Sequence, residues 1–359
     1  MAINVMATTW TRDSHDLFDY ETRQLTTKQL VVTQTSRVIR QGTDVYADET
    51  ETPLPAEPRT DCLVKVAERN GAFYVLPPDR GQVSSANPAS KRLWLVVQEL
   101  PQKGHHIMAG DIIKLGRFKL RVRQLAVSAA EGPAVPELNL DASEVVTIEN
   151  QEELQQSPCR ICLMEGPGGP DDPLITPCSC SGSISYVHLA CLRHWMNARL
   201  NFAESLGGSY FYKQLPCELC KTPYPAYINL TDCRVPLVQV PNTEPPFIVL
   251  ENSVRESQSA HRGLHVISLA ENKQLRLGRG HESDVRIADV SISRCHAIVR
   301  FQRGAFVLED NNSKFGTLVA MRKTRPIDSK TTLAVQCGRT VLKLIQQSTE
   351  GATETQAAS

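Results

Sequence analysis

The chain has 359 residues, and its 39 Lys and Arg residues balance its 39 Asp and Glu residues. This length suits two or three domains, and the zero net charge gives no overall attraction to nucleic acid or anionic membranes. No segment approaches the roughly 18 consecutive apolar residues of a membrane-spanning helix, and MAINVMATTWTRDSHDLFDY lacks the apolar core of a signal peptide. We therefore expect a soluble protein of the cytoplasm or nucleus, with no membrane partner and no specific nucleic-acid partner.

The N-terminal part of the chain predicts a β-rich block. Residues 1–18 are expected to be disordered, and residues 19–126 contain short alternating segments such as DCLVKVAE, GAFYVLPP and RLWLVVQEL. Gly, Pro, Asn and Asp separate these segments, which is typical of antiparallel sandwiches. Residues 127–157 are acidic and lack Lys and Arg, so they predict a solvated linker.

The middle block, residues 158–227, gathers seven of the eleven cysteines together with His188. The order is C-x2-C, C-x-C, H-x2-C and C-x2-C, formed by Cys159, Cys162, Cys178, Cys180, His188, Cys191, Cys217 and Cys220. In a long chain without a signal peptide this spacing favours metal over disulfides. Thiolates and imidazole are zinc ligands, so the eight side chains predict two closed, structural Zn²⁺ sites with no open position for catalysis.

Two zinc-finger families share this C4HC3 order, the RING-CH domain and the plant homeodomain (PHD) finger. The C-x-C knuckle, the seven-residue step SGSISYV and Trp195 after Cys191 resemble RING-CH, and PCSCSGSISYVH, ACLRHW and CELCK are typical of it. A PHD finger normally carries tryptophan two residues before its seventh ligand, where this chain has Leu215. The resemblance implies a small α+β cross-brace with two zinc ions, one held by Cys159, Cys162, His188 and Cys191 and the other by Cys178, Cys180, Cys217 and Cys220.

RING-CH domains are known as E3 ubiquitin ligases, which position a ubiquitin-charged conjugating enzyme (E2) and form no covalent intermediate. The resemblance therefore implies an enzyme without catalytic residues of its own. By motif position it places E2 contacts at Ile161, Trp195 and Pro223, and it places Lys221 where many ligases carry a cation that bridges E2 and ubiquitin. Alternatively, Ile161 and Trp195 only pack the small core, where aromatic and aliphatic side chains are common.

A third block follows a break rich in proline. Residues 228–245 predict a linker, because proline interrupts helices and central strands. Residues 246–346 resemble a forkhead-associated (FHA) domain, a β-sandwich that binds phosphothreonine peptides; the resemblance rests on LRLGRGHESDVRIADVSISRCHAIVRF and LEDNNSKFGTLV. Residues 347–359 are polar and are expected to be a disordered tail.

The FHA resemblance assigns roles to individual residues. It implies phosphopeptide contacts from Arg279, Ser293 and Arg294, because a phosphate of nearly two negative charges suits guanidinium and hydroxyl groups at loop tips. It implies structural roles for Gly278, His296, Gly316 and Thr317. One position departs from the family: Phe315 stands where most members carry the asparagine that holds the peptide backbone, although lysine–aromatic–glycine versions occur.

The first block shares a feature with the third. AGDIIKLGRFKLRVRQL is similar to the closing hairpin of an FHA sandwich, but no phosphate-binding motif precedes it, so residues 19–126 could be a degenerate FHA-like region. DIIKLGRFKLRVRQL and LAVQCGRTVLKLIQQ also share Gly-Arg followed by an alternating strand, a weak indication of a repeated fold.

Two functions remain open on the sequence alone. The favoured one is an E3 ubiquitin ligase that recruits threonine-phosphorylated proteins through its FHA domain. The alternative is a non-catalytic phosphopeptide-binding adaptor in which the zinc domain is structural.

Overall fold

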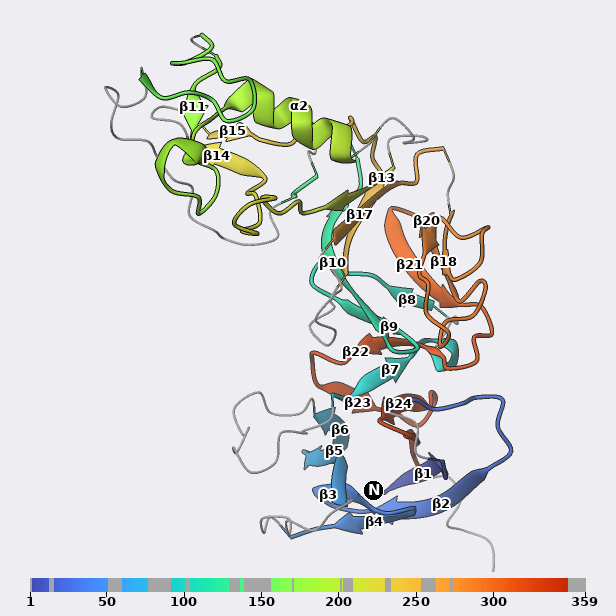
Figure 1. The fold of residues 1–359 in the computed structure, drawn as a ribbon. Helices are drawn as coiled ribbons and strands as arrows, with labels where there is room; N and C mark the ends of the chain where they lie inside the picture. The colour runs from blue at the N-terminus through green and yellow to red at the C-terminus, as the bar shows by residue number, and fades with distance from the viewer. Residues whose placement is uncertain are drawn as a thin grey trace, which may run out of the picture. The chain divides into compact units, whose positions relative to one another are not determined.

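The computed structural model describes residues 2–12, 16–50, 60–76, 92–100, 104–128, 136–138, 156–169, 171–200, 202, 209–229, 234–252, 263–271 and 274–347. The chain forms two compact units, Met1–Lys119 with Gln274–Ser359, and Leu120–Lys273. The expected fold class is confirmed, because strands dominate both flanks and a helix lies in the cysteine-rich region (Figure 1). Among the described residues, no helix is both long and apolar enough to cross a membrane.

The first unit contains strands from both ends of the chain. Its N-terminal strands are β1 (Ile3–Trp10), β2 (Leu25–Val32), β3 (Ser36–Gln41), β4 (Asp44–Asp48), β5 (Thr60–Arg69), β6 (Ala72–Leu76), β7 (Trp94–Val96), β8 (Gly104–His106) and β9 (Ile112–Leu115). The short 3-10 helix η1 (Val97–Glu99) follows β7. Its later strands are β18 (Gln274–Gly278), β19 (Val285–Arg286), β20 (Ala297–Gln302), β21 (Ala305–Asp310), β22 (Thr317–Ala320), β23 (Arg325–Ile327), β24 (Leu333–Cys337) and β25 (Thr340–Gln346).

Strand β1 corrects one expectation. Residues 1–18 were expected to be disordered, but Ile3–Trp10 form a strand whose residues Ile3, Val5 and Ala7 are buried. These apolar residues alternate with Asn4, Met6 and Thr8, which is the pattern of a strand with one buried face. The expectation is therefore wrong for this segment.

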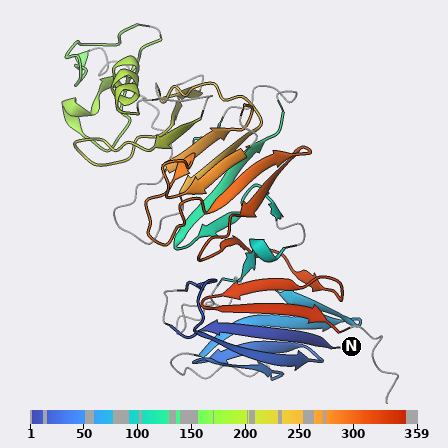
Figure 2. The ribbon, with the colours of Figure 1, turned by 90° about the vertical axis from the view of Figure 1, so that its right-hand side faces the viewer.

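Strands far apart in the sequence share the sheets of the first unit. One sheet runs β9-β22-β7-β24-β25-β1-β2, a second runs β4-β3-β5-β6-β23, and a third runs β19-β18-β20-β21-β8. Figure 2 shows the red C-terminal strands beside the blue N-terminal strands. The core between the first two sheets is likewise shared, since Val5 and Val66 belong to the same buried cluster as Leu342.

The second unit combines a small cysteine-rich fold with a short sheet. Its elements are β11 (Leu174–Ile175), the 3-10 helix η4 (Gly182–Ser185), β12 (Val187–His188), α2 (Leu189–Leu200), β13 (Tyr210–Lys213), β14 (Tyr227–Asn229), β15 (Arg234–Pro236), β16 (Phe247–Asn252) and β17 (Gly263–Ser268). The sheet order is β13-β17-β16-β10, where β10 (Phe118–Ala126) belongs to this unit from Leu120 onward. Leu189, Leu192 and Met196 form the buried face of α2.

The predicted linker 228–245 is partly structured. Strand β15 pairs with β14, and Leu237 and Val238 are buried in the same cluster as the cysteine-rich fold. The boundary predicted after residue 227 is therefore wrong, because it falls inside this hairpin. The acidic linker 127–157 and the tail 347–359 lie mostly outside the described residues.

Candidate functional site

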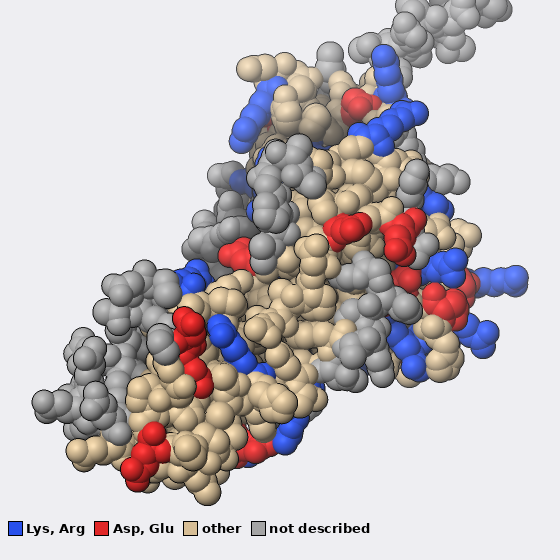
Figure 3. Space-filling view, turned by 90° about the horizontal axis from the view of Figure 1, so that it is seen from above, with Lys and Arg blue, Asp and Glu red and all other residues tan. Residues whose placement is uncertain are grey.

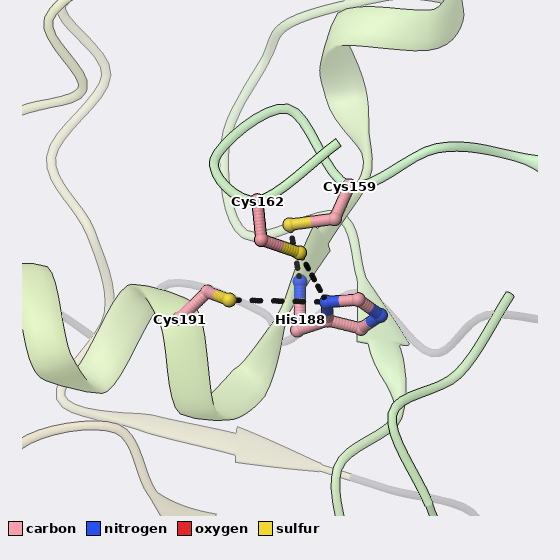
Figure 4. Close-up of side chains that lie close together, drawn as sticks. All are labelled: Cys159, Cys162, His188 and Cys191. Atoms are coloured by element: carbon pink, nitrogen blue, oxygen red, sulfur yellow. Dashed lines mark hydrogen bonds between the residues drawn. The ribbon is translucent and has the colours of Figure 1, made fainter. Parts of the chain in front are cut away.

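The first group of ligand side chains comes from three elements. Cys159 and Cys162 lie on a loop, His188 on β12 and Cys191 in the first turn of α2, and all four point toward one another (Figure 4). Their ligand atoms lie within 4.8 Å of one another. His188 Nδ1 is 3.2 Å from Cys162 Sγ and 3.8 Å from Cys191 Sγ. The other ring nitrogen, Nε2, donates to the Gly166 carbonyl at 2.7 Å, which leaves Nδ1 as the lone-pair donor for a metal.

The second group consists of cysteines alone. The sulfur atoms of Cys178, Cys180, Cys217 and Cys220 lie within 4.8 Å of one another. The two groups interleave along the chain, so the ligand pairs alternate between them. This is the arrangement of a cross-brace, in which each metal ion ties together segments distant in sequence.

Two loops of the site have the same backbone hydrogen bonds. In the first loop, the Cys159 N–H donates to Met164 O and the Leu163 N–H donates to Cys159 O, both at 2.8 Å. In the second loop, the Cys217 N–H donates to Thr222 O at 2.9 Å and the Lys221 N–H donates to Cys217 O at 3.0 Å. Leu163 and Lys221 both adopt positive φ, 65° and 63°. Each loop therefore turns its two thiols toward one point, and Lys221 occupies the place that Leu163 has in the first loop.

The protonation of the thiols is uneven within each group. Burial raises the pKa of Cys159, but hydrogen bonds from the backbone of Cys162, His188 and Ile161 outweigh this effect and lower it to about 7. Burial and then neighbouring thiols raise the pKa of Cys191 to about 12. Zinc binding must displace the remaining protons, so the affinity falls as the medium becomes more acidic.

Both donor sets fit zinc. Three thiolates with one imidazole, and four thiolates, are the usual sets of closed tetrahedral zinc sites. The eight predicted ligands thus form two clusters able to bind two zinc ions. Zinc in such sites stabilises the fold and leaves no open coordination position for a substrate or an activated water.

The sequence analysis missed Arg160, which lies between the first two ligands. Its guanidinium donates to Tyr224 Oη at 2.7 Å, to Ile184 O at 2.9 Å, and to the sulfur atoms of Cys178 and Cys217 at 3.6 and 3.9 Å. A residue of the first loop therefore neutralises part of the charge on the second thiolate group. The sequence did show that Arg160 lies between two metal ligands, in C-R-I-C, and this position was the available indication of its role.

The residues expected to contact E2 have different surroundings. Ile161 is 44% exposed, and Lys221 and Pro223 are also exposed. Trp195 is half-buried, with its ring edge-on to Tyr224 at 5.9 Å between centroids. Trp195 therefore contributes to the domain core, whereas Ile161 is accessible.

Other apolar side chains are exposed around the first loop. Leu163 is 76% exposed, Met164 67%, and Ile184 49%. The Ile184 backbone is bonded to Arg160, next to Ile161, so these residues lie near one another. Exposed apolar groups gathered in this way are typical of a protein-binding surface.

The residues expected to hold phosphate lie on loops of the first unit. Arg279 and Arg294 are exposed, and their loops are joined by bonds from Arg279 N to Ser293 O at 3.1 Å and from Gly280 N to Arg294 O at 2.9 Å. No described carboxylate forms an ion pair with either guanidinium. Gly278 lies so close to Arg294 that an added Cβ would be 2.1 Å from its carbonyl oxygen. The backbones of the two loops can therefore approach this closely only with glycine at this position.

His296 and Asp310 connect the loops that carry the expected phosphate contacts. His296 is fully buried; its Nδ1 accepts from Ser293 N–H at 3.1 Å and its Nε2 donates to Gly316 O at 3.2 Å. Asp310 Oδ1 accepts from Thr317 Oγ1 and Ser313 Oγ at 2.6 and 2.5 Å. Burial lowers the pKa of His296 despite its bond to Gly316. The neutral imidazole, with its proton on Nε2, fixes the spacing between two loops.

Phe315 does not take the role of the family's asparagine. Its ring belongs to an apolar cluster with Trp10, Phe18 and Tyr20, and its centroid lies 6.4 Å from that of Trp10. The adjacent Lys314 ammonium is 3.4 Å from Asp19 Oδ2. The departure in sequence thus corresponds to a packing contact with the N-terminal segment.

Figure 3 shows the charged side chains on one face of the molecule. On this face, basic and acidic residues of the described part are interspersed.

Comparison with known families agrees with these two sites. Residues 159–220 match the RING-variant domain, and residues 275–337 match the FHA domain. The first match includes all eight cysteine and histidine ligands, and the second includes Arg279, Ser293, His296 and Thr317.

Several curated proteins are similar to part of the chain. E3 ubiquitin-protein ligase MARCHF7 of Pongo abelii is 37% identical over 86 residues, which cover 24% of this chain and 11% of that protein. The probable E3 ubiquitin ligase SUD1 of Arabidopsis thaliana is 37% identical over 90 residues, which cover 24% of this chain and 7% of that protein. E3 ubiquitin-protein ligase MARCHF8 of Xenopus tropicalis is 51% identical over 43 residues, which cover 12% of this chain and 16% of that protein. The chain therefore spans a small fraction of these relatives, and what it shares with known families is a RING-variant zinc domain at residues 159–220 and an FHA domain at residues 275–337.

Proposed function

We propose that the protein is a RING-type E3 ubiquitin ligase that recruits phosphothreonine-bearing proteins through its FHA domain. The observation that carries the ligase part is the exposed apolar group around Ile161 beside two closed metal sites. A closed site has no position for substrate, so the domain acts by holding partners rather than by metal catalysis. The names of its relatives as E3 ubiquitin ligases support the same function.

The experiment for the ligase is ubiquitin discharge from a panel of charged E2 enzymes to free lysine, with zinc-loaded protein. Ile161→Ala is the informative variant, because Ile161 is exposed and its truncation leaves the core intact. Val290→Ala, at an 83% exposed position outside the zinc domain, is the matched control. We expect Ile161→Ala to slow discharge at least tenfold and Val290→Ala to leave it unchanged. If the wild-type protein discharges no E2 while binding two zinc ions, the ligase function is refuted and the adaptor becomes the better account.

The recruitment part is supported by the two exposed arginines on adjoining loops. A guanidinium pair without a described acidic partner is suited to a doubly charged phosphate. We expect the protein to bind a degenerate phosphothreonine peptide pool and not its unphosphorylated counterpart. Arg279→Ala should weaken binding by a factor of ten or more, whereas Lys323→Ala, at an exposed loop cation, should not. Equal binding of both peptide pools would refute the phosphate-dependent role.

A further inference from the structure

Two sets of strands in this chain pair in the same order. In the first set, β2-β1 continues into β25-β24-β7, and β4-β3-β5-β6 continues into β23. In the second set, β17-β16 pairs with β10, β9 pairs with β22, and β19-β18-β20-β21 continues into β8. Strands β1–β7 thus correspond in order to β16–β22, and β23–β25 take the places in the first set that β8–β10 take in the second.

We propose that the outer blocks repeat one order of strand pairing, β1–β10 and β16–β25, and that the two repeats have exchanged their last three strands within the chain. Strands β23–β25 pair with strands of the N-terminal repeat, and β8–β10 pair with strands of the repeat that carries the expected phosphate loops. The FHA-matched residues 275–337 therefore include β23 and β24, which pair with the N-terminal repeat, and leave out β8–β10, which pair with their own repeat.

Turn geometry supports the repeat independently of strand order. Asn70-Gly71 joins β5 to β6 with φ of 53° and 78°, and Arg303-Gly304 joins β20 to β21 with φ of 52° and 77°. Positive φ at both turn residues is the type I′ geometry of a tight hairpin. The closing hairpins match as well, because Gly116 after β9 and Gly338 after β24 have φ of 55° and 57°.

Register supports the exchange itself. Strand β1 pairs with β25 from Ile3↔Gln346 to Thr9↔Thr340. Strand β10 pairs with β16 from Leu120↔Asn252 to Ala126↔Phe247. In this second pair the buried Glu251 has Arg123 as its ion partner at 3.3 Å, so a charged contact also joins the exchanged strand to its new neighbour.

N-terminal residues contact two of the loops that carry the expected phosphate-site residues, and one of these contacts comes from the exchanged strands. The turn after β9 lies against Ser291, with Arg117 N–H donating to Ser291 Oγ at 3.0 Å. At a second loop, Tyr20 N–H donates to Lys314 O at 2.9 Å. The Tyr20 ring lies so close to Gly316 that a Cβ there would be 2.6 Å from its Cε2 atom. Tyr20 is therefore a positioning residue for the third phosphate-site loop.

Cross-linking in the full, zinc-loaded chain can distinguish exchange from its alternative. Without exchange, each block would close with its own strands, so β1 would pair with β10. Arg121 and Lys343 occupy equivalent places after Gly-Arg, and Met6 pairs with Lys343 in the exchanged form. Met6→Cys with Lys343→Cys should be bridged by a short bis-maleimide and mapped by mass spectrometry, whereas Met6→Cys with Arg121→Cys should not.

The control pair is Thr8→Cys with Thr27→Cys, since β1 and β2 are hairpin neighbours in either form and these hydroxyls lie 3.5 Å apart. A bridge between positions 6 and 121 would overturn the exchange. So would failure to bridge 6 and 343 under conditions that bridge 8 and 27. Neither result depends on any ligand.

A second readout rests on the proposed phosphopeptide function. Tyr20→Ala should weaken binding of the degenerate phosphothreonine pool at least fivefold. Tyr20→Phe keeps the ring and loses only the bond from Tyr20 Oη to Gln336, so it should restore most of the affinity. If both variants bind as the wild type does, the positioning role is wrong. If the wild type binds no phosphopeptide, the recruitment function fails, and the cross-links alone decide the exchange.

Discussion

Replacing Arg160 with glutamine should weaken one of the two zinc sites selectively. The guanidinium donates to the sulfur atoms of Cys178 and Cys217, at 3.6 and 3.9 Å, and to Tyr224 Oη. Four thiolates around one Zn²⁺ carry a net charge of about −2, and Arg160 offsets half of it. Glutamine retains hydrogen-bonding capacity but not the charge.

Loss of a partner that supports metal ligands typically lowers metal affinity about 10- to 100-fold. This range corresponds to about 1.4 to 2.7 kcal/mol. A hydrogen bond to a charged group is worth about 1.5 to 3 kcal/mol, and solvent screening reduces this free energy because Arg160 is only half-buried. The two ranges therefore agree. The first site shares no bond with this guanidinium among those described, so it should keep its affinity.

The assay is zinc release into a chromophoric chelator, scored as ions released per chain. In Arg160→Gln one zinc should leave at a chelator concentration about 10 to 100 times lower than in the wild type. The matched control is Arg193→Gln, whose guanidinium donates to the Pro236 carbonyl and forms no hydrogen bond to a thiol among the described residues. Identical release curves for Arg160→Gln and wild type would refute the charge-neutralising role.

Three further predictions concern metal, pH and packing. Chelation of zinc should abolish hydrogen-exchange protection of α2 and shift the fluorescence of Trp195, because the ligands hold that helix in place; retention of protection would contradict this. Burial lowers the pKa of His296, so the unfolded chain, with a pKa of about 6.5, takes up the proton first as the pH falls. The contribution of neutral His296 to the free energy of unfolding should therefore be complete above about pH 6.5 and decline below it. Between pH 7.5 and pH 5, the urea midpoint of His296→Asn should fall less than that of the wild type. Gly278→Ala should destabilise the first unit by about 1 to 3 kcal/mol, because its Cβ would lie 2.1 Å from Arg294 O; an unchanged urea midpoint would contradict the close approach.

The sequence predicted the zinc ligands better than their surroundings. Ligand identity follows from spacing alone, because only cysteine and histidine supply such donors at such intervals. The role of Arg160 was not predicted, because an arginine between two ligands could equally be a solvated side chain. Trp195 was expected at the E2 surface, but its contact with Tyr224 depends on a residue far along the chain. Such pair contacts are set by tertiary packing.

The β strands were predicted more reliably than their partners. Alternation in GRTVLKLIQ predicts β25, but no local pattern tells a strand whether to pair with β1 or with β16. The N-terminal strand was missed because its alternation includes threonine and alanine in place of larger apolar residues. The sequence showed that Phe315 replaces the asparagine of most FHA domains. Its packing against the N-terminal apolar cluster could not be predicted, because only the fold brings these residues together.

The pairing of β1 with β25 sets the order of events during synthesis. The side chains of Asn4 and Gln347 share a hydrogen bond across 343 positions of sequence. At about 5 to 20 residues per second, β1 emerges from the ribosome many seconds before its partner strand exists. Until then the strand exposes an unpaired edge, which is a site for aggregation. Nascent chains should therefore depend on chaperones until β25 has been synthesised.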